Sequence, residues 1–219
     1  MKNYVLHFVR HGQTESNGKG EYLGRRTDSE LSLDGIRELI ALREDYEYPA
    51  VELVYSSPLH RCLQTADLIY PDRRIMLVDE LAEMDFGDYE GKTFDELQSR
   101  PDFRRWLTDS RTQSPPSGET GEMFLQRIQA AVAAILEHMM QNEIFEAAVV
   151  THGGVIATLM TTLGIPQQPM QFWKCSGGRG FTCFVNPQLW QRDHLFEVAG
   201  ILPHGASAAF RPDWGKGQA

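Results

Sequence analysis

Residues 4–14 read YVLHFVRHGQT, an apolar run that ends in an arginine, a histidine and a glycine. The run is rich in Val, Leu and Phe and has no clean alternation of apolar and polar side chains. That pattern is typical of a parallel strand whose two faces are both covered. We therefore predict a buried strand over Tyr4–Val9, with Arg10 and His11 directly after its carboxyl end.

Further apolar segments of similar character follow along the chain, with helical patterns between them. Strands that alternate with helices predict an α/β fold: a mostly parallel central sheet flanked by helices on both faces. The chain has no internal repeat or low-complexity linker, so we predict a single domain over residues 1–205 and a C-terminal tail over 206–219. The other expected strands are Leu53–Tyr55, Ile75–Val78, Ala148–Thr151 and Phe181–Val185.

The expected helices carry recognisable start and stop signals. Ser32 is a good cap for one helix, and Ser57 followed by Pro58 predicts the start of the next. Apolar residues at helical spacing over 124–139 predict a long amphipathic helix. A last helix over 154–163 is expected to end where glycine and proline follow.

The least regular stretch of the chain lies between two expected core elements. We predict that residues about 94–121 form a short helical cap inserted into the domain, since long irregular connections often serve as rims or lids. Two interpretations of its arginines stay open at this stage: a rim of the functional site, or a solvated helix face. These arginines are Arg100, Arg104, Arg105 and Arg111.

Composition and charge narrow the classes of function. The 219 residues are 42% hydrophobic, and 21 basic against 30 acidic side chains give a net charge of −9. This balance argues against binding to nucleic acid or to an anionic membrane. No segment suits a signal peptide or a membrane span, and three cysteines without a CxxC pair suit a reducing compartment. We therefore expect a cytoplasmic protein.

Polar and charged side chains gather where the expected strands end. In open α/β sheets, ligands bind at the carboxyl ends of the strands, so residues that directly follow different strands meet at one edge. Here that edge would collect two histidines, two arginines, an asparagine, a carboxylate and a glycine. These residues are Arg10, His11, Asn17, Arg61, Glu83, His152 and Gly153.

Each of these residue types has a physical use in phosphoryl transfer. A neutral imidazole is a competent nucleophile near neutral pH and can carry a phosphoryl group. Arginine binds phosphate oxygens through two parallel hydrogen bonds. A carboxylic acid can protonate a leaving alkoxide and then activate water, and a glycine lets the backbone approach the phosphate closely. The convergence predicts an enzyme that acts on phosphate esters.

Three blocks of this sequence resemble the histidine phosphatase (phosphoglycerate mutase-like) superfamily. The blocks are Arg10-His11-Gly12-Gln13-Thr14 with Asn17, residues 56–66 (SSPLHRCLQTA), and residues 149–156 (VVTHGGVI). They occur in the family's order and span roughly residues 4–185. The resemblance implies a phosphoglycerate mutase-like fold and phosphoester chemistry that needs no metal and no organic cofactor.

The resemblance also implies a role for each matching residue. His11 would be the nucleophile that becomes phosphorylated. Substrate phosphate would be bound by Arg10, Asn17, Arg61, His152 and Gly153, and Arg10, Arg61 and His152 would also take part in catalysis. Glu83 would be the proton donor, although Asp85 is a rival acid in the same segment.

The segment after the acid favours the phosphatase branch over the mutases. Residues 83–91 read EMDFGDYEG and lack the Arg-His-Tyr-Gly stretch of the mutases. Together with the short cap, this segment is similar to that of the α-ribazole-5′-phosphate phosphatases of cobalamin assembly, which place aromatic and small residues near the substrate where residues 172–174 and 178–180 lie. A broad-specificity phosphatase and a phosphoglycerate mutase remain alternatives. A module that binds phosphate esters without turnover is the non-enzyme alternative, and a homodimer is a further expectation.

Overall fold

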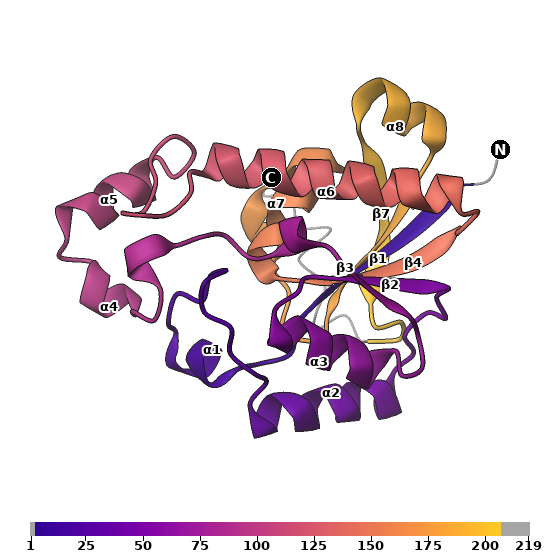
Figure 1. The fold of residues 1–219 in the computed structure, drawn as a ribbon, viewed down its shortest axis with the longest axis horizontal. Coiled ribbons are helices and arrows are strands. Elements are labelled where there is room, and N and C mark those ends of the chain that lie inside the picture. The colour runs from indigo at the N-terminus through magenta and orange to yellow at the C-terminus, as the bar shows by residue number, and fades with distance from the viewer. Residues whose placement is uncertain (1–2, 207–219) are drawn as a thin grey trace, which may run out of the picture.

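A seven-stranded mixed sheet forms the centre of the molecule, in the computed structural model that describes residues 3–206 (Figure 1). The strand order is β3-β2-β4-β1-β6-β7-β5, so the first strand lies in the middle. Of the predicted C-terminal tail, only Ala206 falls within the described residues. The strands are β1 Tyr4–Arg10, β2 Leu53–Ser56, β3 Ile75–Leu77, β4 Glu146–Thr151, β5 Gly164–Ile165, β6 Gly180–Val185 and β7 Phe196–Leu202.

The predicted α/β class with a mostly parallel sheet is confirmed. β1, β2, β3 and β4 pair in parallel, whereas β6 runs antiparallel to both β1 and β7. Helices cover both faces of the sheet, α6 and α7 on one side and α2 and α3 on the other (Figure 1). The helices are α1 Glu15–Lys19, α2 Leu33–Asp45, α3 His60–Ile69, α4 Phe94–Leu97, α5 Pro101–Thr108, α6 Gly121–Gln141, α7 Gly153–Leu163 and α8 Pro187–Asp193.

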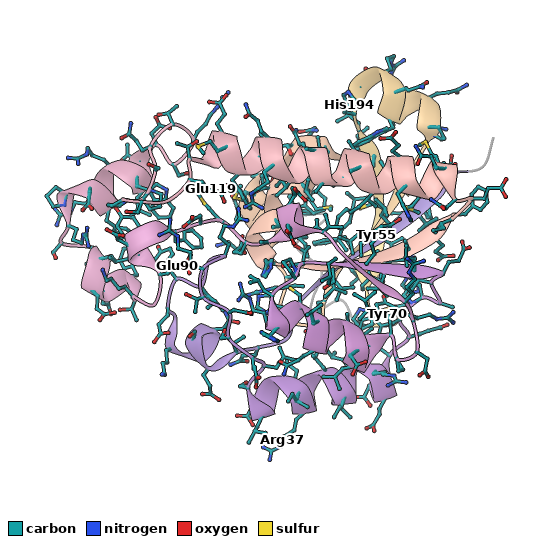
Figure 2. The ribbon with its side chains drawn as sticks, viewed as in Figure 1. Arg37, Tyr55, Tyr70, Glu90, Glu119 and His194 are labelled. Atoms are coloured by element: carbon teal, nitrogen blue, oxygen red, sulfur yellow. The ribbon has the colours of Figure 1, made fainter. Side chains whose placement is uncertain are left out.

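Successive side chains of the central strands feed two separate cores. Phe8 of β1 and Val149 of β4 pack with α6 and α7, while Val9 and Val150 pack on the α2 and α3 side. This follows from the period of two in a strand, and it explains why the strand sequences show no polar alternation. Figure 2 shows side chains filling both layers.

Two predicted helix starts have different outcomes. Ser32 caps α2 as predicted, since its hydroxyl accepts a hydrogen bond from the Gly35 N–H. The start predicted at Ser57 is wrong, because α3 begins at His60 after Leu59, which makes no side-chain cap. The Ser57 hydroxyl lies instead 2.8 Å from Nε2 of His152. The Ser57 side chain therefore contacts His152, far along the chain, although its local sequence predicts a helix cap.

The sequence patterns missed the far edge of the sheet. After β6 the chain adds α8 and then β7, which pairs antiparallel with β6 and parallel with the very short β5. β7 reads FEVAGIL, and its glycine and mixed pattern give a weak strand signal. This edge lies away from the strands that carry the phosphate-binding motifs.

The segment predicted as a cap holds α4 and α5, which lie beyond one end of the central sheet (Figure 1). An aromatic cluster joins this segment to the rest of the molecule. Tyr22 contacts Phe86, Phe103 and Trp106 edge to face, with ring centroids 5.3, 5.8 and 5.9 Å away. Phe86 also contacts Trp106 at 6.0 Å. Phe103 and Trp106 therefore anchor the cap segment to the main hydrophobic core.

Within residues 3–206, no helix is long and apolar enough to cross a membrane.

Candidate active site

His11 and His152 lie side by side at the carboxyl edge of the sheet. The parallel register of β1 and β4 places Arg10 opposite Thr151, so the residues that follow each strand emerge together. The His11 N–H donates to the Thr151 carbonyl oxygen at 2.9 Å, and the two imidazole centroids are 5.1 Å apart. The predicted convergence of these two histidines is thus observed.

The hydrogen bonds of His11 fix its tautomer. Nδ1 lies 2.7 Å from the Gly12 carbonyl oxygen, which can only accept, so Nδ1 carries the proton. Nε2 of the neutral ring then keeps its lone pair. Burial, followed by the charges of Arg61 and Arg10, lowers the pKa of His11 well below its usual value. The ring is therefore neutral and nucleophilic at physiological pH.

His152 has the opposite tautomer. The Nε–H of Arg61 donates to Nδ1 of His152 at 3.3 Å, so the proton of the neutral ring is on Nε2 and is donated to the Ser57 hydroxyl. Burial lowers the pKa of His152 well below its usual value, and the positions of His11 and Arg61 lower it further. Both imidazoles are therefore neutral.

Arg61 is fully buried and held from several directions. Besides the bond to His152, Nη1 donates to the Thr27 carbonyl oxygen at 2.7 Å and Nη2 donates to the Gly24 carbonyl oxygen at 3.0 Å. No carboxylate is among these partners. The guanidinium is thus a fixed positive charge beside His11, with one N–H left over on each terminal nitrogen.

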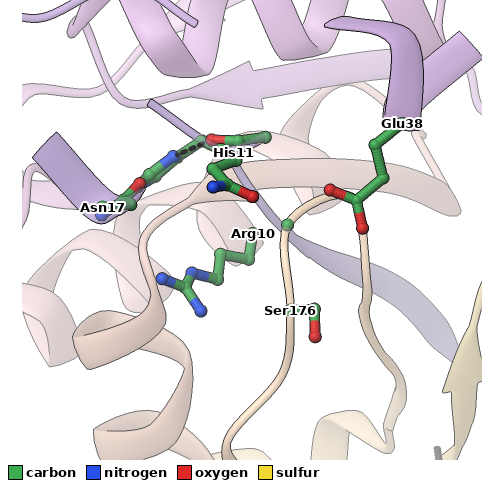
Figure 3. Close-up of a pocket in the computed structure, with 8 residues that line it drawn as sticks. Arg10, His11, Asn17, Glu38 and Ser176 are labelled. Atoms are coloured by element: carbon green, nitrogen blue, oxygen red, sulfur yellow. Dashed lines mark hydrogen bonds between the residues drawn. The ribbon is translucent and has the colours of Figure 1, made fainter. Parts of the chain in front are cut away.

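Arg10 and Asn17 both line the cavity beside His11 (Figure 3). Nη1 of Arg10 donates to the Cys175 carbonyl oxygen at 2.6 Å, while its Nε is buried without a hydrogen-bond partner in the described part of the chain. Oδ1 of Asn17 accepts from the Thr14 N–H in the capping box of α1, which leaves the amide nitrogen as the free donor. Both residues therefore offer unused donors.

Glu83 and Gly154 are fitted to one another. The Glu83 carboxylate accepts from the N–H groups of Met84 and Gly154, both at 2.9 Å, and its side chain is almost fully buried. A Cβ atom on Gly154 would lie 2.4 Å from Oε1 of Glu83, so any side chain here would displace the Glu83 carboxylate. Burial raises the pKa of Glu83 despite these bonds and the nearby arginines. The carboxyl group is poised to hold a proton more readily than an exposed glutamate.

Asp85 occupies a different environment from Glu83. Its carboxylate pairs with Arg26 at 2.8 Å and accepts from the Gly87 N–H at 2.9 Å. It is absent from the residues that line the cavity beside His11. The geometry therefore favours Glu83 over Asp85 as the acid that faces a substrate.

Two connected lobes open on either side of His11, and Arg10, His11 and Asn17 line both. One lobe, of about 280 Å³, is polar and is completed by Gly12, Gln13, Glu38, Ser176 and Gly177 (Figure 3). The other, of about 370 Å³, contains Glu83 and has a largely apolar wall. Its remaining lining residues are Glu21, Tyr22, Leu23, Phe86, Gly153, Gly154, Ala157, Met170, Lys174 and Cys175.

Not every residue proposed from sequence lies on the cavity surface. Arg61 and His152 are buried behind His11, whereas Arg10, Asn17, Glu83 and Gly153 line the lobes. Of the aromatic and basic residues at 172–174, Lys174 lines the Glu83 lobe, but Trp173 is fully buried in the hydrophobic core. Glu38, Tyr22 and Met170 also line the lobes, and the sequence does not predict them because no local signal marks a side chain that lines a distant wall.

The arginines of the cap segment belong to its solvated surface. Arg104, Arg105 and Arg111 are exposed, and Arg100 pairs with Asp102 at 2.7 Å. None of them lines either lobe. The exposure of Arg104 and Arg105 on α5 agrees with the interpretation as a solvated helix face.

Cys62 packs beside His152, with its sulfur 3.5 Å from Nε2. Burial raises the pKa of this thiol to about 12, so it stays protonated. A protonated, buried thiol is a poor nucleophile, so Cys62 does not compete with His11 as the candidate nucleophile. Among residues 3–206, no group of three or more His, Cys, Asp and Glu side chains is placed to hold a metal ion.

A mixed α/β sheet with a neutral histidine, two arginines and a buried acid at one edge defines a phosphoryl-transfer enzyme of the histidine type. The model of the histidine phosphatase superfamily (branch 1) matches residues 6–184. Because this match covers most of the chain, the protein belongs to that superfamily.

Similar proteins include both phosphatases and a mutase. A Hydrogenobacter thermophilus protein named "Putative phosphoserine phosphatase 2" is 34% identical, over 73% of this chain and 80% of its own. The adenosylcobalamin/alpha-ribazole phosphatase of Escherichia coli is 30% identical, over 79% and 86%. A solved Bacillus anthracis phosphoglycerate mutase superposes with a TM-score of 0.73 over 91% and 92% of the chains; at 22% identity it shows the shared fold alone. The predicted fold and phosphatase class are confirmed.

Proposed function

We propose that this phosphatase hydrolyses phosphate monoesters through a phosphorylated His11. The observation that carries the proposal is the lone pair on Nε2 of His11, fixed by the Gly12 carbonyl oxygen, in a cavity that also presents Arg10 and Glu83. A neutral imidazole held in one tautomer attacks without a separate base to activate it. The proposed chemistry needs no metal ion.

In the first step, Nε2 of His11 attacks the phosphorus atom and the ester P–O bond breaks. The leaving oxygen takes the proton of Glu83, whose raised pKa favours the protonated form before the reaction. Arg10 binds the phosphoryl oxygens from the cavity side, together with the amide nitrogen of Asn17 and the backbone at Gly153. Arg61 acts from the buried side, where a fixed donor stabilises the developing charge, and His152 helps to hold it there by accepting from its Nε–H.

In the second step, water attacks the phosphorus atom of phospho-His11. Glu83 is now ionised and accepts a proton from that water, and the P–N bond breaks to release inorganic phosphate. His11 and protonated Glu83 are both restored, so the cycle closes without another cofactor.

For the substrate, we propose a phosphate ester whose alcohol carries an apolar group. The lobe beside Glu83 receives the leaving alcohol, and Tyr22, Phe86 and Met170 form part of its wall. α-Ribazole-5′-phosphate, with its aromatic base, fits this description, and the similarity to the Escherichia coli enzyme supports it. Broad specificity and mutase activity remain alternative outcomes. The three free cysteines support a cytoplasmic location, and a homodimer stays a prediction.

The test is phosphate release from a panel of esters in excess EDTA, with wild type and His11→Ala. The panel contains α-ribazole-5′-phosphate, phosphoserine, phosphoglycerates, sugar phosphates and p-nitrophenyl phosphate. We expect turnover by wild type, none by the variant, and a base-stable, acid-labile phosphoryl group on wild type alone. Binding of these esters without turnover would identify a binding module instead. Loss of activity in EDTA would contradict the metal-free mechanism.

A further inference from the structure

Arg127 of α6 holds the segment that carries Glu83 by its backbone. Its Nη1 donates to the carbonyl oxygens of Glu80 and Ala82, at 2.6 and 3.0 Å. Its Nη2 donates to the carbonyl oxygen of Glu83 itself, at 3.2 Å. One side chain from a long helix therefore binds three backbone carbonyl groups of a segment that has little regular structure of its own.

Glu119 completes this clamp. It pairs with Arg127 through both carboxylate oxygens, at 2.6 and 3.3 Å, and it accepts a hydrogen bond from the Asp85 N–H at 2.8 Å. The two side chains are only 14% and 10% exposed. The two bonds to Glu119 and the three bonds to carbonyl oxygens together use all five N–H groups of the Arg127 guanidinium. Glu119 lies just before α6, at the junction with the cap segment (Figure 2).

The clamp acts on the site through the backbone that carries Glu83. Neither Arg127 nor Glu119 lines the lobes beside His11. Within residues 3–206, the Glu83 carboxylate accepts hydrogen bonds from the backbone N–H groups of Met84 and Gly154. The position of the carboxyl group thus depends on where the backbone of residues 80–85 lies, and the clamp decides that position.

We infer that Arg127 and Glu119 are positioning residues for acid catalysis: they hold the Glu83 carboxyl group at the leaving oxygen and have no part in phosphate binding. This inference rests on the proposed role of Glu83. A shift of about 1 Å in a catalytic group can lower a rate about 10²-fold. Lysine cannot replace Arg127, because an ammonium has three donors on one nitrogen and lacks the planar fork.

The test compares kcat/KM for two esters that differ in their need for a proton. Glycerol phosphate releases a strongly basic alkoxide and needs the acid, whereas p-nitrophenyl phosphate releases a weakly basic phenolate and does not. The ratio kcat/KM reports steps up to departure of the leaving group, so hydrolysis of phospho-His11 does not affect it. The variants are Arg127→Met, Arg127→Lys and Glu119→Gln. Glu83→Gln is the positive control, and Arg100→Met, which breaks the ion pair with Asp102 in the cap, is the matched control.

We expect Arg127→Met and Glu119→Gln to lower kcat/KM roughly tenfold or more for glycerol phosphate, and less than threefold for p-nitrophenyl phosphate. Arg127→Lys should follow the same pattern, and Arg100→Met should change neither value. Activity on the aryl ester shows that a variant is folded. Equal losses on both esters, or no loss on either, would overturn the inference. If Glu83→Gln itself shows no difference between the esters, the proposed role of Glu83 fails, and the inference fails with it.

Discussion

Two buried histidines, one in the middle of β1 and one directly after it, meet very different partners. His7, within the strand, has both ring nitrogens engaged, one with Thr182 Oγ1 at 3.0 Å and one with the Glu146 carboxylate at 2.9 Å. His11, directly after the strand, bonds only through Nδ1 and has arginines nearby. Both rings have a lowered pKa, chiefly through burial. Burial alone therefore does not make a histidine a nucleophile. The ring also needs a free nitrogen that faces a cavity.

The largest expected effect tests that difference directly. His11→Gln should lower kcat by at least about 10⁴-fold, because loss of a nucleophile removes the covalent route. His7→Gln should change kcat less than twofold, since His7 lies in the middle of the strand and its side chain bonds to Thr182 and Glu146, which do not line the lobes. Steady-state turnover of both variants, with circular dichroism to establish folding, checks the pair. A large loss in folded His7→Gln would break the comparison.

The next effect separates the two candidate acids. Glu83→Gln should lower kcat/KM about 10²- to 10⁴-fold for an alkyl phosphate, as expected for loss of a general acid. Asp85→Asn keeps its size and loses only its ion pair with Arg26, so we expect less than a threefold change. If Asp85→Asn gave the larger loss, the assignment of the proton donor would be reversed.

A smaller loss is expected at Arg61. Arg61→Lys keeps a positive charge beside His11 but loses the fork that binds Thr27, Gly24 and His152. We expect kcat to fall about 10²-fold, as when a single fixed donor is removed from a transition-state site. Arg104→Lys, on the exposed cap surface, is the control. Unchanged turnover in Arg61→Lys would show that charge alone is sufficient at this position.

The smallest expected effect is the contribution of His7 to the pH dependence of the free energy of unfolding. Because its pKa is lowered in the folded state, the unfolded chain binds more protons as the pH falls below about 6.5, so stability decreases with acidification. His7→Gln removes this dependence. The free energy of unfolding should then fall less steeply between pH 6.5 and 5, by at most about 1.4 kcal/mol per pH unit. Urea titrations at several pH values measure this slope, and identical slopes would contradict the prediction.

The sequence predicted the central strands and the convergence of the phosphate-binding motifs well. The reason is that the strands follow from local patterns such as residues 4–14, and the carboxyl-edge rule then brings together the residues that follow them. Ser57 shows the limit of such patterns. Its local context predicts a helix cap, but a histidine far along the chain takes its hydroxyl. No local signal could have indicated that contact.

The walls of the cavity were equally beyond local patterns. Glu38 comes from α2 and Met170 from the segment after β5, so each reaches the site only through tertiary packing. The Arg127 clamp likewise joins the middle of α6 to a distant segment. β7 was not predicted either, because its pairing with β6 favours a strand more than its own residues do.

The aromatic cluster under the cap has a consequence for how this enzyme changes over evolutionary time. Tyr22 and Phe86 line the Glu83 lobe and also pack on Trp106 of α5. A substitution that adapts either ring to a new alcohol therefore also alters the anchoring of the cap. A change in substrate preference therefore also changes the local stability of the cap segment, while the phosphate chemistry at His11 can stay constant. New specificities should thus arise through paired changes, one in the lobe and one in α5.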